Sequence, residues 1–242
     1  MATNNLVIDM GNTQTKCALF NEGNIVLLAK FRSLSEWTKW LKKISYKSVI
    51  VSSVATKQAT AFVLEKLNDP IHFNHLTPLP IQNTYKTPET LGLDRLANAV
   101  AAHNLDHKKP VLVIDGGTCL KFDITNNGCY LGGAISVGLN MRFKALHHFT
   151  AQLPMIDNLD SLDIIGNNTE TSMRSGALNG FLFEIKSTIE AYEQHFKNLS
   201  VVCTGGNSQL IVNSFSKQKN SIFADRWLTL KGLNQILAFN EK

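Results

Sequence analysis

The chain has 242 residues, 44% of them hydrophobic and 18% charged, which is typical of a folded globular protein and excludes long disordered or fibrous chains. Its formal net charge of +5 comes without a long basic run and so does not indicate a nucleic-acid partner. No apolar run reaches the ~18 residues that a membrane-spanning helix needs, and the polar start MATNN does not resemble a signal peptide. The four cysteines lack CxxC spacing, which favours reduced thiols. We therefore expect a cytoplasmic protein with no membrane partner.

The N-terminal half predicts three consecutive strands, followed by alternating helices and strands. Apolar runs bounded by turn residues indicate the strands, and apolar residues at helical spacing indicate the helices. The first helix is expected to begin at Ser35, which serves as its N-cap, and to bury Trp37. The predicted elements are strands at Leu6–Met10, Thr15–Phe20, Asn24–Phe31 and Ser48–Val54, and helices after Ser35 and at Lys57–Leu67.

A second cycle follows a connecting loop at Pro70–Pro88, which contains four of the six prolines and has room for a short strand at most. The longest helical pattern of the chain lies in this second half, and a glycine-rich strand precedes it. The predicted elements are a helix at Gly92–Asn104, two strands within Val111–Ile124, a strand at CYLGGAISVG, helices near Glu170–Phe196, Asn207–Phe215 and Leu230–Phe239, and strands at SVVCTGG and Ser221–Phe223.

An internal repeat organises these elements. VIDMGNT (Val7–Thr13) and VIDGGT (Val113–Thr118) each place an aspartate at the end of a strand, then a glycine turn, a threonine and a return strand. Each copy opens a series of the order βββαβα, which indicates a duplicated fold. We therefore predict two α/β domains, 1–106 and 107–242, each with a mixed sheet flanked by helices.

The two repeated turns are suited to phosphate binding. They match neither the P-loop nor the dinucleotide-binding glycine pattern. Gly11 and Gly117 have no Cβ, so a phosphate can approach the backbone closely. Asp9 and Asp115, each at the end of a strand, are placed to hold a cation that neutralises phosphate charge. The alternative is a pair of Asx-type turns without a ligand.

A third segment, GLDR, opens the helix that starts near Gly92. Asp94 can serve as a general base toward a hydroxyl, and Arg95 can clamp a carboxylate or phosphate. The alternative is an aspartate that only complements the helix dipole, beside a solvated arginine. The glycine clusters LGGAISVGLN and CTGGNSQLI are compatible either with a bound nucleotide or with close packing of a strand against a helix.

Taken together, these motifs resemble the type III pantothenate kinase family, within the superfamily of sugar kinases, heat-shock chaperones and actin. The resemblance extends along nearly the whole chain. It rests on DMGNT, GLDR, DGGTC, GGAISVG, NTETSMRSGALNG, TGG and LTLKGL. The fold that it implies has two ribonuclease H-like (actin-like ATPase) domains with a nucleotide cleft between them.

The resemblance implies that ATP phosphorylates the 4′-hydroxyl of pantothenate, the first step of coenzyme A biosynthesis, with Asp94 as the proton acceptor. It also implies Mg²⁺ near Asp9, a monovalent cation (K⁺ or NH₄⁺) at Asp115, and a homodimer with the site near the interface. The residues implied to contact ATP are Asp9, Met10, Gly11, Asn12, Thr13, Gln14, Thr15, Lys16, Thr118, Gly205 and Gly206. Those implied to contact pantothenate are Tyr85, Gly92, Leu93, Asp94, Arg95 and Thr169.

Two positions depart from the family pattern. Cys119 replaces the usual alanine of the second phosphate motif, and Val137 replaces a proline; neither changes a charge, so we interpret both as packing changes. The alternatives to a pantothenate kinase are a regulatory protein linked to transcription, an ATPase or chaperone-like switch, and a sugar or acetate kinase. The retained acidic residues, the GLDR segment and the short chain favour the pantothenate kinase.

Overall fold

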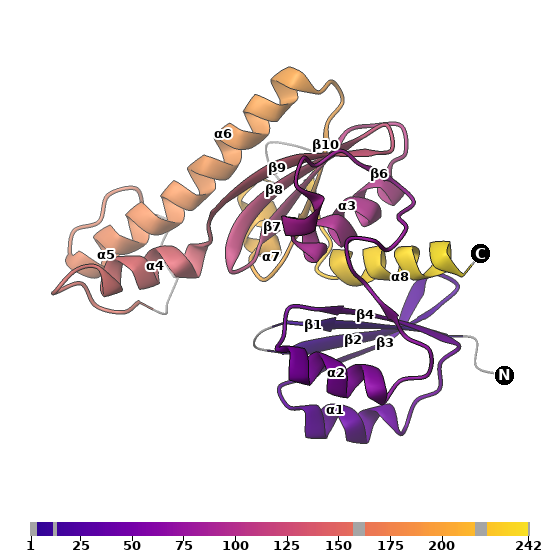
Figure 1. The fold of residues 1–242 in the computed structure, drawn as a ribbon. Coiled ribbons are helices and arrows are strands. Elements are labelled where there is room, and N and C mark those ends of the chain that lie inside the picture. The colour runs from indigo at the N-terminus through magenta and orange to yellow at the C-terminus, as the bar shows by residue number, and fades with distance from the viewer. Residues whose placement is uncertain (1–3, 12–13, 157–162, 216–221, 242) are drawn as a thin grey trace. The chain divides into compact units, whose positions relative to one another are not determined.

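The structure is a computed structural model that describes residues 4–11, 14–156, 163–215 and 222–241 (Figure 1). The chain forms two compact units. Unit 1 contains Met1–Leu105, Gly128–Tyr130 and Trp227–Lys242, and unit 2 contains Asp106–Asn127 and Leu131–Arg226. Compared with the expected domains 1–106 and 107–242, unit 1 also includes the C-terminal helix.

Unit 1 is built on a five-stranded mixed sheet in the order β3-β2-β1-β4-β5. β1 pairs antiparallel with β2 and parallel with β4, so the first hairpin and the first crossover share the central strand. The strands are β1 (Asn5–Met10), β2 (Thr15–Asn21), β3 (Asn24–Phe31), β4 (Ser48–Ser53) and β5 (Ile71–His72).

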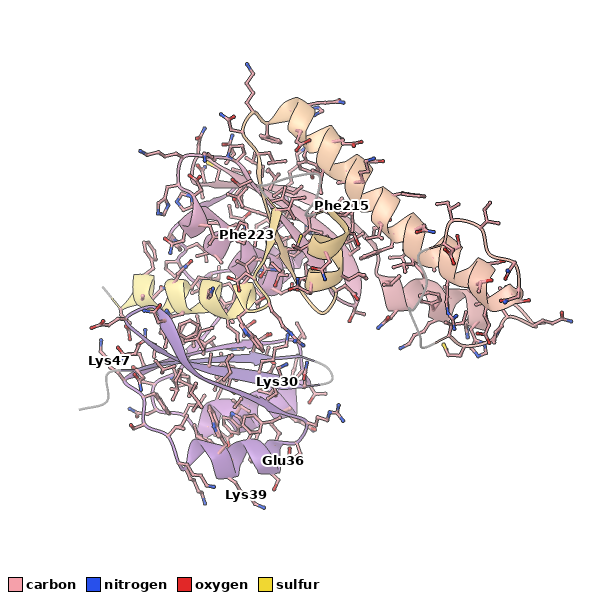
Figure 2. The ribbon with its side chains drawn as sticks, turned by 180° about the vertical axis from the view of Figure 1, so that it is seen from behind. Lys30, Glu36, Lys39, Lys47, Phe215 and Phe223 are labelled. Carbon is pink, nitrogen blue, oxygen red and sulfur yellow. The ribbon has the colours of Figure 1, made fainter. Side chains whose placement is uncertain are left out.

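The two faces of this sheet bury alternate residues of β1, because successive side chains of a strand point to opposite faces. Leu6 and Ile8 pack with Trp37 of α1 (Leu34–Leu41) and Val63 of α2 (Lys57–Glu65). Figure 1 shows α1 and α2 together on that face, and Glu36 and Lys39 project from α1 away from the sheet (Figure 2). Val7 packs on the other face.

The Val7 face is covered by α8 (Leu228–Asn240), and α3 (Leu93–Leu105) packs on α8; apolar residues of both helices share one core with Val7. The two helices approach closely at Gly232, where an added Cβ would lie 1.8 Å from the carbonyl oxygen of Ala97. Trp227, just before α8, has the ammonium group of Lys30 4.9 Å from the centre of its ring. The chain therefore returns to its first sheet at the C-terminal end.

Unit 2 contains most of a six-stranded sheet in the order β11-β10-β7-β8-β9-β6. Its edge strand β6 and the start of β9 belong to unit 1. The strands are β6 (Gln82–Asn83), β7 (Val111–Gly116), β8 (Cys119–Asn126), β9 (Cys129–Val137), β10 (Ser200–Thr204) and β11 (Ile222–Ala224). The antiparallel β7–β8 hairpin repeats the β1–β2 hairpin of unit 1.

The helices of unit 2 share a core with this sheet; α6, for example, contributes Phe181, Ile185 and Ile189, which cluster with Leu112 and Phe122. They are α4 (Leu139–His148), α5 (Thr169–Arg174), α6 (Gly180–His195) and α7 (Ser208–Phe215). A π-helical turn over Ser175–Asn179 joins α5 to α6. A short 3₁₀ turn at Pro88–Thr90 precedes α3 in unit 1.

The predicted fold class, two mixed sheets flanked by helices, is confirmed. One detail was wrong: α1 is capped by Ser33, not by Ser35. Ser33 has extended backbone angles, and its hydroxyl accepts a hydrogen bond from the Glu36 amide at 3.2 Å. The helix expected near Glu170–Phe196 is interrupted by the π-helical turn. Within the described residues, none of the helices has both the length and the apolar character needed to cross a membrane.

Candidate functional site: two aspartate hairpins and the start of helix α3

The β1–β2 hairpin places Asp9 directly opposite Lys16 on neighbouring strands. Their charged groups lie 3.9 Å apart, and the Lys16 side chain is 38% exposed, so this ammonium group is accessible to a ligand. The Gly11 amide donates to the carbonyl oxygen of Gln14 at 3.1 Å, which closes the turn. This arrangement leaves a carboxylate, an amine and a tight turn at one end of the strand.

The other predicted ATP contacts of this hairpin differ in exposure. The side chains of Met10 and Thr15 are buried in unit 1, so at Met10 only the backbone can contact a ligand. Gly11 and Gln14 line a cavity of about 240 Å³, together with Arg32 of the β3–α1 connection. Asn12 and Thr13 lie outside the described residues. Arg32 is a cationic candidate that the sequence pattern did not reveal.

The β7–β8 hairpin repeats this arrangement around Asp115. Lys121 lies opposite Asp115 on the neighbouring strand, and its Nζ is 2.8 Å from the carboxylate. Both side chains are largely buried, at 15% exposure for Lys121 and 12% for Asp115. Thr118, at the turn, is exposed. An added Cβ at Gly138, which lies between β9 and α4, would be 2.1 Å from the Thr118 carbonyl oxygen, so the chain must pass this turn at a glycine.

The β10–α7 turn packs against the same aspartate. Gly205 has φ +82°, and an added Cβ there would lie 2.4 Å from Asp115 Oδ1. Gly206 is exposed, with no atom within 4 Å of the corresponding position. Asn207 donates from its backbone amide and its side-chain amide to the Gly116 carbonyl oxygen, at 2.9 and 3.0 Å. Unit 2 therefore brings Asp115, Thr118, Gly205 and Gly206 together.

The GLDR segment lies at the start of α3 in unit 1. Asp94 Oδ1 accepts a hydrogen bond from the Arg95 amide at 3.0 Å, and an added Cβ at Gly92 would lie 2.6 Å from the same oxygen. Arg95 is 4% exposed, with its guanidinium 5.6 Å from the centre of the Tyr85 ring. The alternative of a solvated arginine is therefore excluded. Leu93 packs against the unit 1 core.

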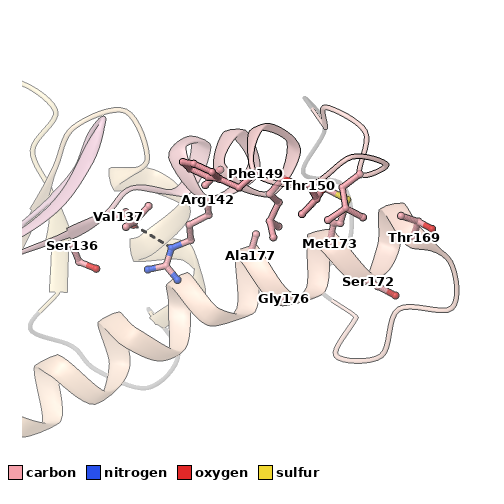
Figure 3. Close-up of a pocket in the computed structure, with 13 residues that line it drawn as sticks. Ser136, Val137, Arg142, Phe149, Thr150, Thr169, Ser172, Met173, Gly176 and Ala177 are labelled. Carbon is pink, nitrogen blue, oxygen red and sulfur yellow. Dashed lines mark hydrogen bonds between the residues drawn. The ribbon is translucent and has the colours of Figure 1, made fainter.

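Thr169 lies in unit 2, at the start of α5, and lines a cavity of about 900 Å³ between α4 and the α5–α6 segment (Figure 3). Asn168 caps α5 by accepting from the Thr171 amide at 2.9 Å. Arg142 enters the cavity from α4, donates through Nε to the Val137 carbonyl oxygen at 3.1 Å, and pairs with Glu184. The cavity wall is otherwise mainly apolar. The structure describes Thr169 and the GLDR residues in separate units.

The described residues contain no group of three or more histidine, cysteine or acidic side chains that could hold a metal ion. Any divalent cation at Asp9 would therefore need further ligands from a bound phosphate and from water, which is the usual coordination of Mg²⁺. Two cysteine thiols are buried: burial raises the pKa of Cys203 to about 12 and raises that of Cys17 even more.

Besides Arg32, three residues of these sites were missed from the sequence. Lys121 could have been found from the register of the hairpin, because counting outward from the turn places it opposite Asp115. Asn207 follows a Gly-Gly pair, a position where polar residues often cap helices. No sequence pattern indicated Arg142, because its ion pair with Glu184 depends on the approach of α4 to α6.

Solved structures of other proteins share this fold over nearly the whole chain. A candidate Baf family transcriptional activator from Campylobacter jejuni has a TM-score of 0.65 at 20% identity, covering 98% of each chain. A glucokinase from an Antarctic psychrotroph has a TM-score of 0.55 at 14% identity, covering 99% of this chain and 100% of that one. At these identities the likeness shows only the fold, which is that of the actin-like sugar kinases.

Sequence comparison identifies the family. Residues 5–191 match the family described as type III pantothenate kinase. A type III pantothenate kinase from Christiangramia forsetii is 42% identical over 244 aligned residues, covering 98% of this chain and 99% of that protein. One from Phocaeicola vulgatus is also 42% identical, with the same coverage. The chain therefore belongs to the type III pantothenate kinase family.

Proposed function

We propose that the chain transfers the γ-phosphoryl group of ATP to the 4′-hydroxyl of pantothenate, the first step of coenzyme A biosynthesis. The observation that carries this proposal is the 42% identity to type III pantothenate kinases over 98% of the chain. The geometry of the hairpins and of GLDR supports it, because phosphoryl transfer depends mainly on positioning and on stabilising negative charge.

The β1–β2 hairpin is the proposed phosphate and magnesium site. Lys16 is exposed enough to contact a phosphate, and the Gly11 turn allows close approach of the backbone. Asp9 is 20% exposed and would hold Mg²⁺, which commonly takes one or two protein carboxylates and completes its shell with phosphate oxygens and water. When bound, Mg²⁺ neutralises charge that develops on the phosphates. Thr118, Gly205 and Gly206 complete the proposed ATP contacts.

GLDR is the proposed pantothenate site. Pantothenate carries a carboxylate, and the buried guanidinium of Arg95 is a suitable partner for it. The Tyr85 ring lies next to that guanidinium, with 5.6 Å between Arg95 Cζ and the ring centre. Asp94 would accept the proton of the 4′-hydroxyl as the oxygen attacks the γ-phosphorus, while ADP leaves. Gly92 leaves room for the Asp94 carboxylate, since a Cβ there would overlap it.

Three further features are proposed from the family resemblance. A homodimer is supported by the apolar, open cavity at Thr169, where Phe149 is 81% exposed, since exposed apolar surface often marks an interface. A cytoplasmic location agrees with the free cysteines. The resemblance also implies a monovalent cation at Asp115. We infer from it that the reaction needs one positive charge beside this carboxylate.

The variant Asp94→Asn tests the assigned base. We expect it to lose turnover by about 10²–10⁴-fold, the usual contribution of a general base, while the Kd for ATP changes little. ADP release with pantothenate measures the first quantity and calorimetric titration with ATP the second. Asp106→Asn, at a partly exposed acidic residue of unit 2, is the matched control and should keep full turnover. Retained turnover in Asp94→Asn would refute the assignment.

A further inference from the structure

The charge beside Asp115 is supplied by the chain itself. Lys121 lies directly opposite Asp115 in the β7–β8 register, with Nζ 2.8 Å from Oδ2. This is the distance of a charge-assisted hydrogen bond. The strand pairing holds both Cα positions, so the contact does not depend on a flexible loop.

The equivalent pair in the first hairpin is much looser. Lys16 lies opposite Asp9 in the same way, but their charged groups are 3.9 Å apart and Lys16 is 38% exposed, compared with 2.8 Å and 15% for Lys121. Exposed pairs are weak and are easily exchanged for a ligand, whereas pairs that are mostly removed from water are not. The repeat therefore has one lysine available to a ligand and one that is committed to its aspartate.

The surroundings of Asp115 leave little room for a separate cation. Oδ2 is engaged by Lys121, and Oδ1 lies against the glycine turns, 2.4 Å from a Cβ position at Gly205 and 3.1 Å from one at Gly117. A potassium ion needs several oxygen ligands, and the Lys121 ammonium group at Oδ2 would repel an ion that approached Oδ1. The residues present do not fit the monovalent cation that the family resemblance implies.

We propose that the Lys121 ammonium group takes the place of the monovalent cation, so that phosphoryl transfer by this chain does not require potassium or ammonium. A lysine head group carries the same charge as an ammonium ion and has three N–H donors, against four in the free ion. Because it is tethered by the hairpin, its local concentration does not depend on the salt of the solution. This inference rests on the proposed kinase function, since it assigns the charge that balances the bound phosphates.

The first test needs no variant. ADP release with pantothenate is measured in tetramethylammonium, sodium, potassium and ammonium chloride at equal ionic strength, with ATP supplied as its sodium salt. We expect turnover to vary by less than about twofold among the four salts, because a largely buried pair is little screened. A requirement for potassium or ammonium of about tenfold or more would overturn the inference while leaving the kinase function intact.

The second test removes the amine. Lys121→Thr should lose about tenfold or more of turnover in tetramethylammonium or sodium, since a mostly buried charge is left without its partner, and potassium or ammonium should restore it. Lys109→Thr, which breaks an exposed ion pair with Asp106 in the same unit, is the control and should match the unmodified chain. A Lys121→Thr variant with normal, salt-independent turnover would overturn the proposal.

Melting midpoints provide a readout that does not need turnover. With ATP and Mg²⁺ present, potassium should raise the midpoint of Lys121→Thr but not that of the unmodified chain, because only the variant has space for the ion. The neutral pair Asp115→Asn/Lys121→Thr should fold and show no response to potassium. If pantothenate elicits no ADP release in any salt, the kinase function fails, and the midpoints still decide the role of Lys121: equal responses to potassium in both chains would contradict it.

Discussion

Gly205→Ala should disturb both the stability of unit 2 and the second aspartate hairpin. Gly205 has φ +82°, where an L-residue places its Cβ too close to the backbone. The added methyl group would lie 2.4 Å from Asp115 Oδ1, 2.8 Å from the carbonyl carbon of Gly116 and 2.9 Å from the amide nitrogen of Gly117. Two of these three atoms belong to the backbone, so a side-chain rotation cannot relieve the overlap.

The magnitude follows from these two effects. The left-handed conformation costs about 1–2 kcal/mol for alanine, and an extra methyl group in a tightly packed site costs about 1–3 kcal/mol. We therefore expect a loss of about 3 kcal/mol in the free energy of unfolding. For a chain of this size that loss lowers the melting midpoint by about 6–12 °C.

The neighbouring glycine provides the control. Gly206 has open space within 4 Å of its Cβ position and no positive φ, so Gly206→Ala should change the midpoint by no more than about 2 °C, as is usual for a surface substitution. Thermal melts followed by circular dichroism, with and without ATP, compare the two variants. Equal midpoints for Gly205→Ala and Gly206→Ala would refute the packing argument at Asp115.

Three further predictions concern the hydrogen bond of Asn207, the packing of α8 against α3, and the cysteine thiols. Asn207→Ala removes the 3.0 Å hydrogen bond to the Gly116 carbonyl oxygen and should weaken ATP binding about fivefold, from a loss of about 1 kcal/mol; an unchanged Kd in calorimetry would contradict this. Gly232→Ala puts a methyl group 1.8 Å from the Ala97 carbonyl oxygen and should lower the melting midpoint by more than about 4 °C, from about 2 kcal/mol of overpacking. In the folded chain Cys119 and Cys129 should react with a thiol reagent near pH 8, whereas Cys17 and Cys203 should not. Burial raises the pKa of Cys203 from its ordinary value of 9.0 to about 12, so the unfolded chain loses that proton first and the free energy of unfolding should fall as pH rises from 9.0 toward about 12. Rapid labelling of all four thiols would contradict the first expectation, and a free energy of unfolding that does not fall over this pH range would contradict the second.

Much of the fold could be predicted because the local signals are strong. Asn24–Phe31 was predicted with the bounds that β3 has, since a turn and a charged segment limit it on both sides. The cap of α1 was misplaced because Ser33 and Ser35 are both good caps, and only the observed backbone angles of Ser33 distinguish them. The sequence at the π-helical turn, Ser175–Asn179, continues the helical pattern on both sides, so no local signal predicts the interruption.

The candidate site was predictable in its motifs but not in its pairings. The glycine turns and GLDR stand out in the sequence, whereas the burial of Arg95 depends on Tyr85 and on the packing of α3. Lys121 looks like an ordinary strand lysine until the hairpin register places it opposite Asp115. The return of α8 to unit 1 is a tertiary contact, made through Gly232 and Ala97, that no local pattern encodes.

The most direct measurement of the central claim is the product formed by the purified chain with ATP and Mg²⁺. Pantothenate and glucose, the latter chosen because the fold is shared with a glucokinase, are supplied separately, and the reaction mixtures are analysed by mass spectrometry and by ADP release. The proposed function predicts a singly phosphorylated pantothenate with equimolar ADP, and no phosphorylated glucose. Phosphorylation of glucose, or the absence of phosphorylated pantothenate in every salt, would contradict it.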